Sequence, residues 1–389
     1  MEKTKKILIF STAYYPFVGG AEVAIKEITD RISDIQFDLI TARLDSKVSK
    51  GTFDRSERIG NVNVYRLGFG ISILDKLILP FWGAFYALHL NSKNNYGYYW
   101  CVMVTFASGA AYIANIIRFW KPMPVILTLQ EGDSEEHFKN RWFGLINLSW
   151  RLALKNTKIL TVISSYLAER AKKFGYEGKI EVIPNGADID KFNIELNKEE
   201  KEKIRKDLNL EKNDIILITT SRLTEKNGVG DVIKALPKLP ENIKFLILGG
   251  GELEEKLKEL TKNLKVSDKV IFKGCVSHNE MPKYLKVCDI FIRPSLSEGM
   301  GNSFVEAMAA GIPIIGTPVG GIVDFLKDEE TGLFCNVNDP ESIAKKVMEY
   351  INNPDLVSKI VENAKKLTRE KYDWNLIAKK METVFKNIK

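Results

Sequence analysis

Two glutamates eight positions apart flank the part of the sequence that is best suited to bind a charged ligand. Glu298 follows a predicted strand, Asp289–Pro294, and Glu306 lies about one turn inside the helix expected next. That helix is predicted to begin near residue 302 or 303 and to run to Ala310, with Gly311 as its C-terminal stop. The loop and the helix start between the two glutamates consist of Gly299, Met300, Gly301, Asn302 and Ser303.

A helix that begins after glycines is suited to bind an anion. Its first backbone N–H groups have no partners within the helix, and its dipole places roughly half a positive charge there. A diphosphate fits this position, while Glu306 could accept hydrogen bonds from a ribose diol and Glu298 from sugar hydroxyls. The alternative is a strand–turn–helix with two surface glutamates. The combination of strand, glycine loop and helix favours a nucleotide-sugar site.

Two basic residues follow another predicted strand, Asp214–Thr220. Arg222 and Lys226 would project from its carboxyl end, where ligands bind in open parallel sheets. Fixed cations there could stabilise the charge of a departing nucleoside diphosphate, arginine as a fork and lysine as a point charge. A solvated charge pair is the alternative. We predict that Arg222, Lys226 and Glu298 form the catalytic set.

The N-terminal half contributes two further candidate loops. Gly19 and Gly20 precede a predicted helix, where missing side chains let backbone amides approach a ligand; a plain loop-to-helix turn is the alternative. Gln130 and Glu131 follow the predicted strand 125–129 and could contact the sugar or the acceptor. Glu131 and the nearby Asp133 could equally be solvated loop acids.

Predicted strands alternate with predicted helices along the chain, which indicates parallel sheets built from βαβ units. We expect strands at 6–10, 36–42, 62–67, 101–106, 125–129, 158–163, 179–183, 214–220, 243–249, 269–274, 289–294 and 312–317. We expect helices at 20–32, 107–119, 141–155, 165–174, 198–207 and over most of 340–388. The turn Ile183–Gly186 interrupts the pattern and indicates two doubly wound α/β domains joined near 185–195.

Composition limits the classes of function. The net charge of +7, from 57 basic and 50 acidic residues, is mild and diffuse, and no nucleic-acid motif is present. The four cysteines and three histidines show no metal-ligand spacing, so no metal is expected, and His89, His137 and His278 are interpreted as structural or exposed. The sparse cysteines and the N-terminus, which resembles a first strand, predict a cytoplasmic protein.

Two segments suggest contact with a membrane. Ile71–Leu90 is apolar, but Asp75, Lys76 and Pro80 interrupt it, so a buried or interfacial helix is expected. Phe138–Lys155 is aromatic, apolar and basic, and could rest on an anionic membrane; the alternative is a core helix with a solvated basic face. Peripheral contact with the inner face of the membrane is therefore an open expectation.

The motifs together resemble the retaining glycosyltransferases of family 4, which have the GT-B fold. Glu298 and Glu306 match the family's E-x7-E region, and Arg222 with Lys226 matches its R-x3-K site. The stretch around Gly19 resembles its P-x-x-G-G-x-E loop, and Val276 lies in a segment similar to its base-reading G-x-V. The resemblance implies two Rossmann-like domains facing across a cleft, at 1–186 and 187–371, with a C-terminal helix near 372–389 packed back onto the first.

The resemblance also implies the reaction. A hexose would pass from a UDP- or GDP-sugar to a hydroxyl of a glycan or lipid-linked acceptor, with retention of configuration and without metal or cofactor, in cell-surface polysaccharide or glycoconjugate synthesis. The sequence departs from the family at Gln130, where many members carry a histidine. The alternatives are a GT-B sugar-nucleotide 2-epimerase and a non-catalytic nucleotide-sugar binder.

Overall fold

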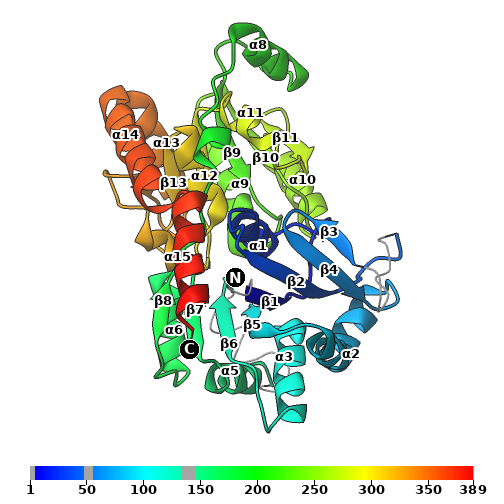
Figure 1. Ribbon diagram of the computed structural model, residues 1–389. Helices are drawn as coiled ribbons and strands as arrows, with labels where there is room; N and C mark the ends of the chain where they lie inside the picture. Colours follow the sequence, from blue (N-terminus) through cyan, green and yellow to red (C-terminus); the bar gives the residue numbers. More distant parts are fainter. Residues whose placement is uncertain (1–4, 48–55, 133–144, 389) are drawn as a thin grey trace. The chain divides into compact units, whose positions relative to one another are not determined.

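The protein forms two compact units in a computed structural model that describes residues 5–47, 56–132 and 145–388 (Figure 1). The first unit comprises Met1–Asn185 together with Trp374–Lys389, and the second comprises Gly186–Asp373. Each unit has its own parallel sheet with helices packed against it. These two α/β units confirm the expected fold class.

The first unit is built on a sheet with the strand order β3-β4-β2-β1-β5-β6-β7-β8. Every neighbouring pair is parallel except β3 and β4. The strands are β1 (Lys5–Phe10), β2 (Ile35–Ala42), β3 (Glu57–Ile59), β4 (Val62–Leu67), β5 (Tyr96–Val102), β6 (Val125–Leu129), β7 (Ile159–Val162) and β8 (Ile180–Val182). The central strands are buried on both faces, which explains their nearly continuous apolar sequences.

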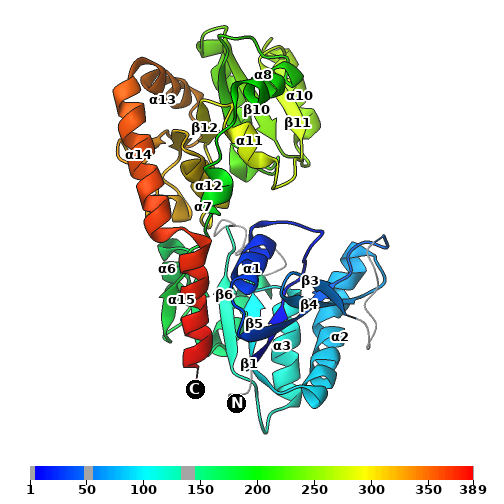
Figure 2. The same cartoon turned by 45° about the horizontal axis from the view of Figure 1, so that its top comes forward.

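Helices cover both faces of this first sheet (Figures 1 and 2). One face carries α1 (Gly20–Asp30) and α15 (Trp374–Asn387), which share a core with β1, β2 and β5. The other carries α2 (Ser72–Lys93), α3 (Phe106–Ile117) and α5 (Leu145–Lys155), while α6 (Ser165–Lys173) lies beside β7 and β8. The last helix, α15, thus returns to the sheet that the N-terminus begins.

The second unit has an all-parallel sheet with the order β11-β10-β9-β12-β13-β14. Its strands are β9 (Ile215–Thr220), β10 (Ile243–Leu248), β11 (Val270–Gly274), β12 (Ile290–Arg293), β13 (Ile314–Gly316) and β14 (Leu333–Phe334). Its α-helices are α7 (Ile189–Phe192), α8 (Lys198–Asp207), α9 (Val229–Ala235), α10 (Glu254–Asn263), α11 (Met281–Leu285), α12 (Asn302–Ala310), α13 (Pro340–Asn352) and α14 (Pro354–Lys371). Short 3-10 turns span Glu225–Asn227, Leu236–Lys238 and Gly320–Asp324.

One predicted strand was misplaced. We expected a strand at 101–106, but β5 ends at Val102 and α3 begins at Phe106. Met103 has a positive φ of 67°, which ends the strand, and Thr105 and Ser108 form a capping box that starts the helix. Local capping therefore outweighed the apolar character of this run.

Helix α2 is the one described helix that is long and apolar enough to cross a membrane. In the folded unit it packs beside α3 and along β2 and β4, so 39% of its apolar window is buried within the protein. Length and composition alone carry no further conclusion, because the core helices of other proteins meet the same criteria.

Candidate functional site

The two loops with candidate catalytic residues lie side by side in the second unit. Strands β9 and β12 are neighbours, so their carboxyl ends bring the loop after Thr220 next to the loop after Arg293. The backbone N–H of Leu296 donates to the carbonyl oxygen of Lys226 at 2.7 Å. Gly228 approaches the second loop so closely that a Cβ there would lie 2.0 Å from a carbonyl oxygen. The R-x3-K loop is therefore fixed against the glycine loop that precedes α12.

The two predicted cations of this site differ in exposure. The Arg222 side chain is exposed, whereas Lys226 is half-buried in the short turn that begins at Glu225. The turn is held by Asn227, whose side-chain amide donates to the carbonyl oxygen of Arg222 at 2.6 Å. The loop backbone is thus ordered by its own residues, and the Arg222 guanidinium can reach a ligand in solution.

Helix α12 begins and ends where the sequence predicted. Gly301 precedes it with a φ of 91° and no side-chain cap, and Gly311 ends it with a φ of 80°. Only glycine adopts such angles readily, so both ends are set by local sequence. Gly299, Met300 and Gly301 are buried, whereas Asn302 and Ser303 are half-buried at the helix start. An anion could bind at this amino end.

A buried arginine that the sequence analysis did not identify organises this loop. Arg293, the last residue of β12, donates to a Glu298 carboxylate oxygen at 2.6 Å and to the Ser303 hydroxyl at 2.8 Å. Its guanidinium lies 4.5 Å from the centre of the Phe304 ring. Burial lowers the pKa of Arg293, and the Glu298 and Glu306 carboxylates oppose that effect. A basic residue within an otherwise apolar strand was the signal that could have revealed it.

The second candidate glutamate is held by a histidine. Glu306 is buried, and its carboxylate lies 2.8 Å from Nε2 of His278. The other ring nitrogen, Nδ1, lies 3.0 Å from the Lys191 ammonium. An ammonium can only donate, so Nδ1 accepts and the proton sits on Nε2, which donates to Glu306. His278, predicted to be structural or exposed, is half-buried and positions the carboxylate of the candidate residue Glu306.

The candidates of the first unit lie at the carboxyl edge of its sheet. Gly19 and Gly20 are exposed at the start of α1, which has no side-chain cap. Gln130 follows β6, and its side-chain oxygen accepts a hydrogen bond from Asn185 at 3.1 Å. Asp133 and His137 lie outside the described residues, as does most of the segment before α5.

Glu131 is buried and already hydrogen-bonded. Its side chain is 5% exposed, and its carboxylate accepts the backbone N–H groups of Val104 and Gln130. Burial raises the pKa of Glu131 to about 7, against the lowering effect of these hydrogen bonds. The expectation of a solvated loop acid was wrong. The two carboxylate oxygens of Glu131 hold together the backbone at the carboxyl ends of β5 and β6. The predicted contact of Glu131 with an acceptor stays a prediction.

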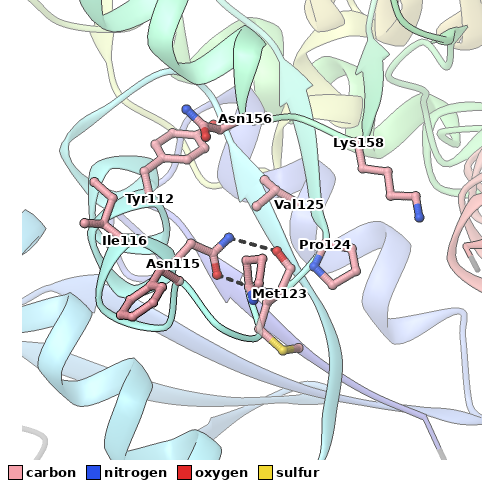
Figure 3. Close-up of a pocket in the computed structure, with 10 residues that line it drawn as sticks. Tyr112, Asn115, Ile116, Met123, Pro124, Val125, Asn156 and Lys158 are labelled. Atoms are coloured by element: carbon pink, nitrogen blue, oxygen red, sulfur yellow. Dashed lines mark hydrogen bonds between the residues drawn. The ribbon is translucent and has the colours of Figure 1, made fainter.

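A separate pocket of about 480 Å³ lies elsewhere in the first unit (Figure 3). Its lining includes Pro122–Val125, which lead into β6, and Lys158, which precedes β7, so it sits at the amino edge of the sheet. Asn115 braces one wall through two 2.8 Å hydrogen bonds with the Met123 backbone. The candidate residues Gly19 and Gln130 lie at the opposite edge, so this pocket is not part of the predicted site. Among the described residues, no group of three or more histidine, cysteine, aspartate or glutamate side chains could hold a metal ion.

Comparisons with known proteins identify the class. Residues 18–191 match the family model Glycosyltransferase Family 4, and residues 200–367 match Glycosyl transferases group 1. The chain is 28% identical to an uncharacterized glycosyltransferase of Methanocaldococcus jannaschii over 98% of each chain. It is also 28% identical to a GDP-mannose-dependent phosphatidylinositol monomannoside mannosyltransferase of Mycobacterium tuberculosis, over 58% of this chain and 60% of that protein.

The fold is shared with solved structures. The structure of HepE from Anabaena in complex with UDP-glucose superposes with a TM-score of 0.78, over 98% of this chain and all of that one, at 19% sequence identity. The family models, the relatives and this shared architecture together support a GT-B glycosyltransferase. The expected GT-B fold is thereby confirmed.

Proposed function

We propose that the protein transfers a hexose from a UDP- or GDP-sugar to a hydroxyl group of a glycan or lipid-linked acceptor, with retention of anomeric configuration. The reaction would serve the synthesis of a cell-surface polysaccharide or glycoconjugate and would require neither metal nor cofactor. One observation carries the proposal: the hydrogen bond from Leu296 to Lys226 holds the two cations of the 222–226 loop beside the glycine loop that leads into α12.

The mechanism follows from the charges of this edge. The donor diphosphate would lie at the amino end of α12, within reach of Arg222 and Lys226. As the bond between the anomeric carbon and the phosphate oxygen breaks, these fixed charges stabilise the departing diphosphate, an effect worth roughly 10²–10³ in rate for one preorganised group. The acceptor oxygen forms its new bond on the same face, and its proton passes to the departing phosphate oxygen.

The remaining candidates would bind the other parts of the donor. Glu306, oriented by His278, would accept hydrogen bonds from the ribose diol, and Glu298, oriented by Arg293, from the sugar hydroxyls. The backbone at Val276 would read the base. Gly19, Gly20 and Gln130 belong to the first unit, and their contacts with the diphosphate and the sugar remain predictions.

The relatives support both classes of nucleotide. The mycobacterial relative is named as GDP-mannose-dependent, and the HepE structure holds UDP-glucose. A backbone that reads the base leaves no side-chain signature that would separate uracil from guanine. The donor must therefore be identified by experiment.

The direct test is a donor screen with product analysis. The purified chain is titrated calorimetrically with UDP and GDP, and then incubated with labelled UDP- and GDP-hexoses, a simple alkyl glycoside acceptor and a chelator. We expect binding of one nucleotide, transfer that the chelator leaves unchanged, and a product whose anomeric configuration matches the donor.

Two lysine variants distinguish the loss of a charge in the proposed site from the loss of a positive charge elsewhere on the surface. Lys226→Ala should slow transfer by roughly 10²–10³, whereas Lys256→Ala, which removes an exposed lysine of α10, should leave it unchanged. Equal activity in the two variants, or no heat with either nucleotide, would refute the proposed site. Conversion of the donor sugar without any acceptor would instead indicate an epimerase.

A further inference from the structure

Helix α2 exposes apolar side chains where a surface helix normally exposes polar ones. Between residues 71 and 88 the exposed residues are all large and apolar except Ser72: Ile71, Ile73, Leu74, Leu77, Phe81 and Phe85. Ile73 is 75% exposed, Phe81 63% and Phe85 64%. The opposite side of α2 packs against α3 and the sheet. Because both sides are apolar, the outer side needs a partner other than water.

The end of α3 and the turn that follows it continue this exposed apolar character. Ile116, Phe119 and Trp120 are 72%, 78% and 71% exposed, and the two aromatic rings meet edge to face at 5.1 Å. Figures 1 and 2 show α2 and α3 side by side on the same face of the first sheet. The pocket of Figure 3 is lined by Ile116, near the end of α3, and by Phe119, in the turn after it.

In the described segments that form this face, the charged side chains that reach the surface are basic. The described residues 68–132 and 145–158 include only two acidic side chains, Asp75 and Glu131, and both are buried. The same residues include seven basic side chains, at positions 76, 93, 118, 121, 151, 155 and 158. The whole chain has nearly balanced charges, with 57 basic and 50 acidic residues. The Asp75 carboxylate is used internally, where it accepts the N–H groups of Leu44, Phe69 and Gly70.

We propose that this apolar and basic face, formed by the exposed sides of α2, the end of α3 and α5, docks the protein on the surface of a lipid bilayer with anionic head groups. Its apolar side chains enter the boundary between head groups and acyl chains, while its lysines and arginines pair with lipid phosphates. Stable docking requires these two contributions together, and the face supplies both. Helix α2 lies along the membrane, because its inner side is occupied by α3 and β2.

The charge pattern selects a lipid surface over other partners. A second copy of this chain docked through the same face in a two-fold dimer would bring basic residues against basic residues. The phosphates of a nucleic acid would pair with the lysines but would leave Ile73, Phe81 and Phe85 exposed to water. Only an anionic bilayer matches the apolar and the basic side chains at the same time.

The segment expected from sequence differs from the face that the structure reveals. In α5, Leu152 is the one large apolar side chain that is exposed among its described side chains, beside Arg151 and Lys155. Helix α5 thus supplies mainly positive charge. The apolar contribution comes mainly from α2, with the end of α3 and the turn after it; within α2, Phe81 and Phe85 are the most exposed aromatic residues.

Co-sedimentation of the full chain with vesicles tests the proposal. One set contains phosphatidylcholine alone, and the other adds about 30% phosphatidylglycerol to supply negative charge. We expect binding to the second set only, weakened by added salt because the basic side chains contribute. The double variant Phe81→Ser, Phe85→Ser should lower the partition at least about tenfold, and Lys121→Glu, Lys155→Glu by a similar factor.

Matched controls separate docking from general effects of the substitutions. Val182→Ser with Val337→Ser removes exposed apolar side chains elsewhere, and Lys203→Glu with Lys206→Glu makes the same change of net charge on α8. Both should bind vesicles as the unmodified chain does, and circular dichroism should show every variant folded. No vesicle binding, or equal loss in face and control variants, would overturn the proposal. So would a dimer in solution that the phenylalanine variant dissociates.

Activity on a soluble acceptor distinguishes this inference from the proposed function. The face variants should keep their turnover of a soluble acceptor, because none of the changed residues belongs to the predicted site. Vesicle binding without any transferase activity would leave the docking surface in place and refute only the proposed reaction. A face variant that lost turnover of a soluble acceptor while keeping vesicle binding would contradict the docking role.

Discussion

Replacing Arg293 with methionine should destabilise the loop and helix start of the second unit by about 3–5 kcal/mol. The guanidinium donates to Glu298 at 2.6 Å and to Ser303 at 2.8 Å. A hydrogen bond to a charged group is worth about 1.5–3 kcal/mol, and one to a neutral hydroxyl about 1 kcal/mol. Methionine also leaves the Glu298 carboxylate, only 16% exposed, without its cation. Removing one partner of a buried ion pair typically costs about 3–5 kcal/mol.

A double-mutant cycle isolates the pair. In the chain that carries Glu298→Gln, no carboxylate is stranded, so Arg293→Met should cost at least about 2 kcal/mol less than it does alone. Arg293→Lys keeps the charge but cannot bridge Glu298 and Ser303, so it should fall between methionine and arginine. A lysine that behaved like arginine would mean that charge alone suffices.

Hydrogen exchange measured by mass spectrometry is the appropriate assay, because the chain has two units and global unfolding would mix their transitions. Exchange in peptides from α12 gives the free energy of local opening for each variant. If the costs of Arg293→Met and Glu298→Gln simply added within about 0.5 kcal/mol, the two side chains would be independent and the reasoning refuted.

Three further predictions address other parts of the structure. Gly228→Ala should destabilise the chain by more than about 2 kcal/mol, because the new Cβ would clash with a carbonyl oxygen. The control Gly274→Ala has a similar positive φ but open space around it, and should cost about 1 kcal/mol. Equal melting temperatures of the two variants would contradict this prediction. His278→Ala should release the Glu306 carboxylate and so weaken binding of the cognate nucleoside diphosphate about fivefold to tenfold in titration calorimetry. Binding of the 2′,3′-dideoxy analogue, which lacks the ribose hydroxyls, should not weaken. Equal losses for the two ligands would mean that His278 does not act through the ribose contact of Glu306. Burial raises the pKa of Glu131 to about 7, so the folded chain keeps a proton that the unfolded chain releases from about pH 4.5 upward. The free energy of unfolding should therefore fall by up to about 3 kcal/mol as the pH rises from about 4.5 to about 7. Glu131→Gln should flatten this part of the pH profile of thermal unfolding, and an unchanged slope would argue against a buried proton.

Features set by neighbouring residues could be predicted from the sequence. The bounds of α12 follow from glycines that adopt positive φ at both ends, and α8 occupies the predicted residues 198–207 because Asn197 and Glu200 form a capping box. The alternation of apolar runs and amphipathic stretches predicted the parallel α/β fold. The misplaced strand at 101–106 shows the limit of this approach, because a capping box there was not recognised.

The partners of the candidate site residues were decided only by the tertiary structure. Glu306 meets His278, which lies in a loop 28 positions away. Leu296 meets Lys226 from 70 positions away, because the strand order places β9 beside β12. The sequence specified the residue types, but local periodicity contains no information about which distant strands become neighbours. The apolar outer side of α2 was likewise not visible from the sequence, because large apolar residues occur on both sides of this helix. Only packing determines which side of such a helix is left exposed, because burial depends on what lies against it and not on its own sequence.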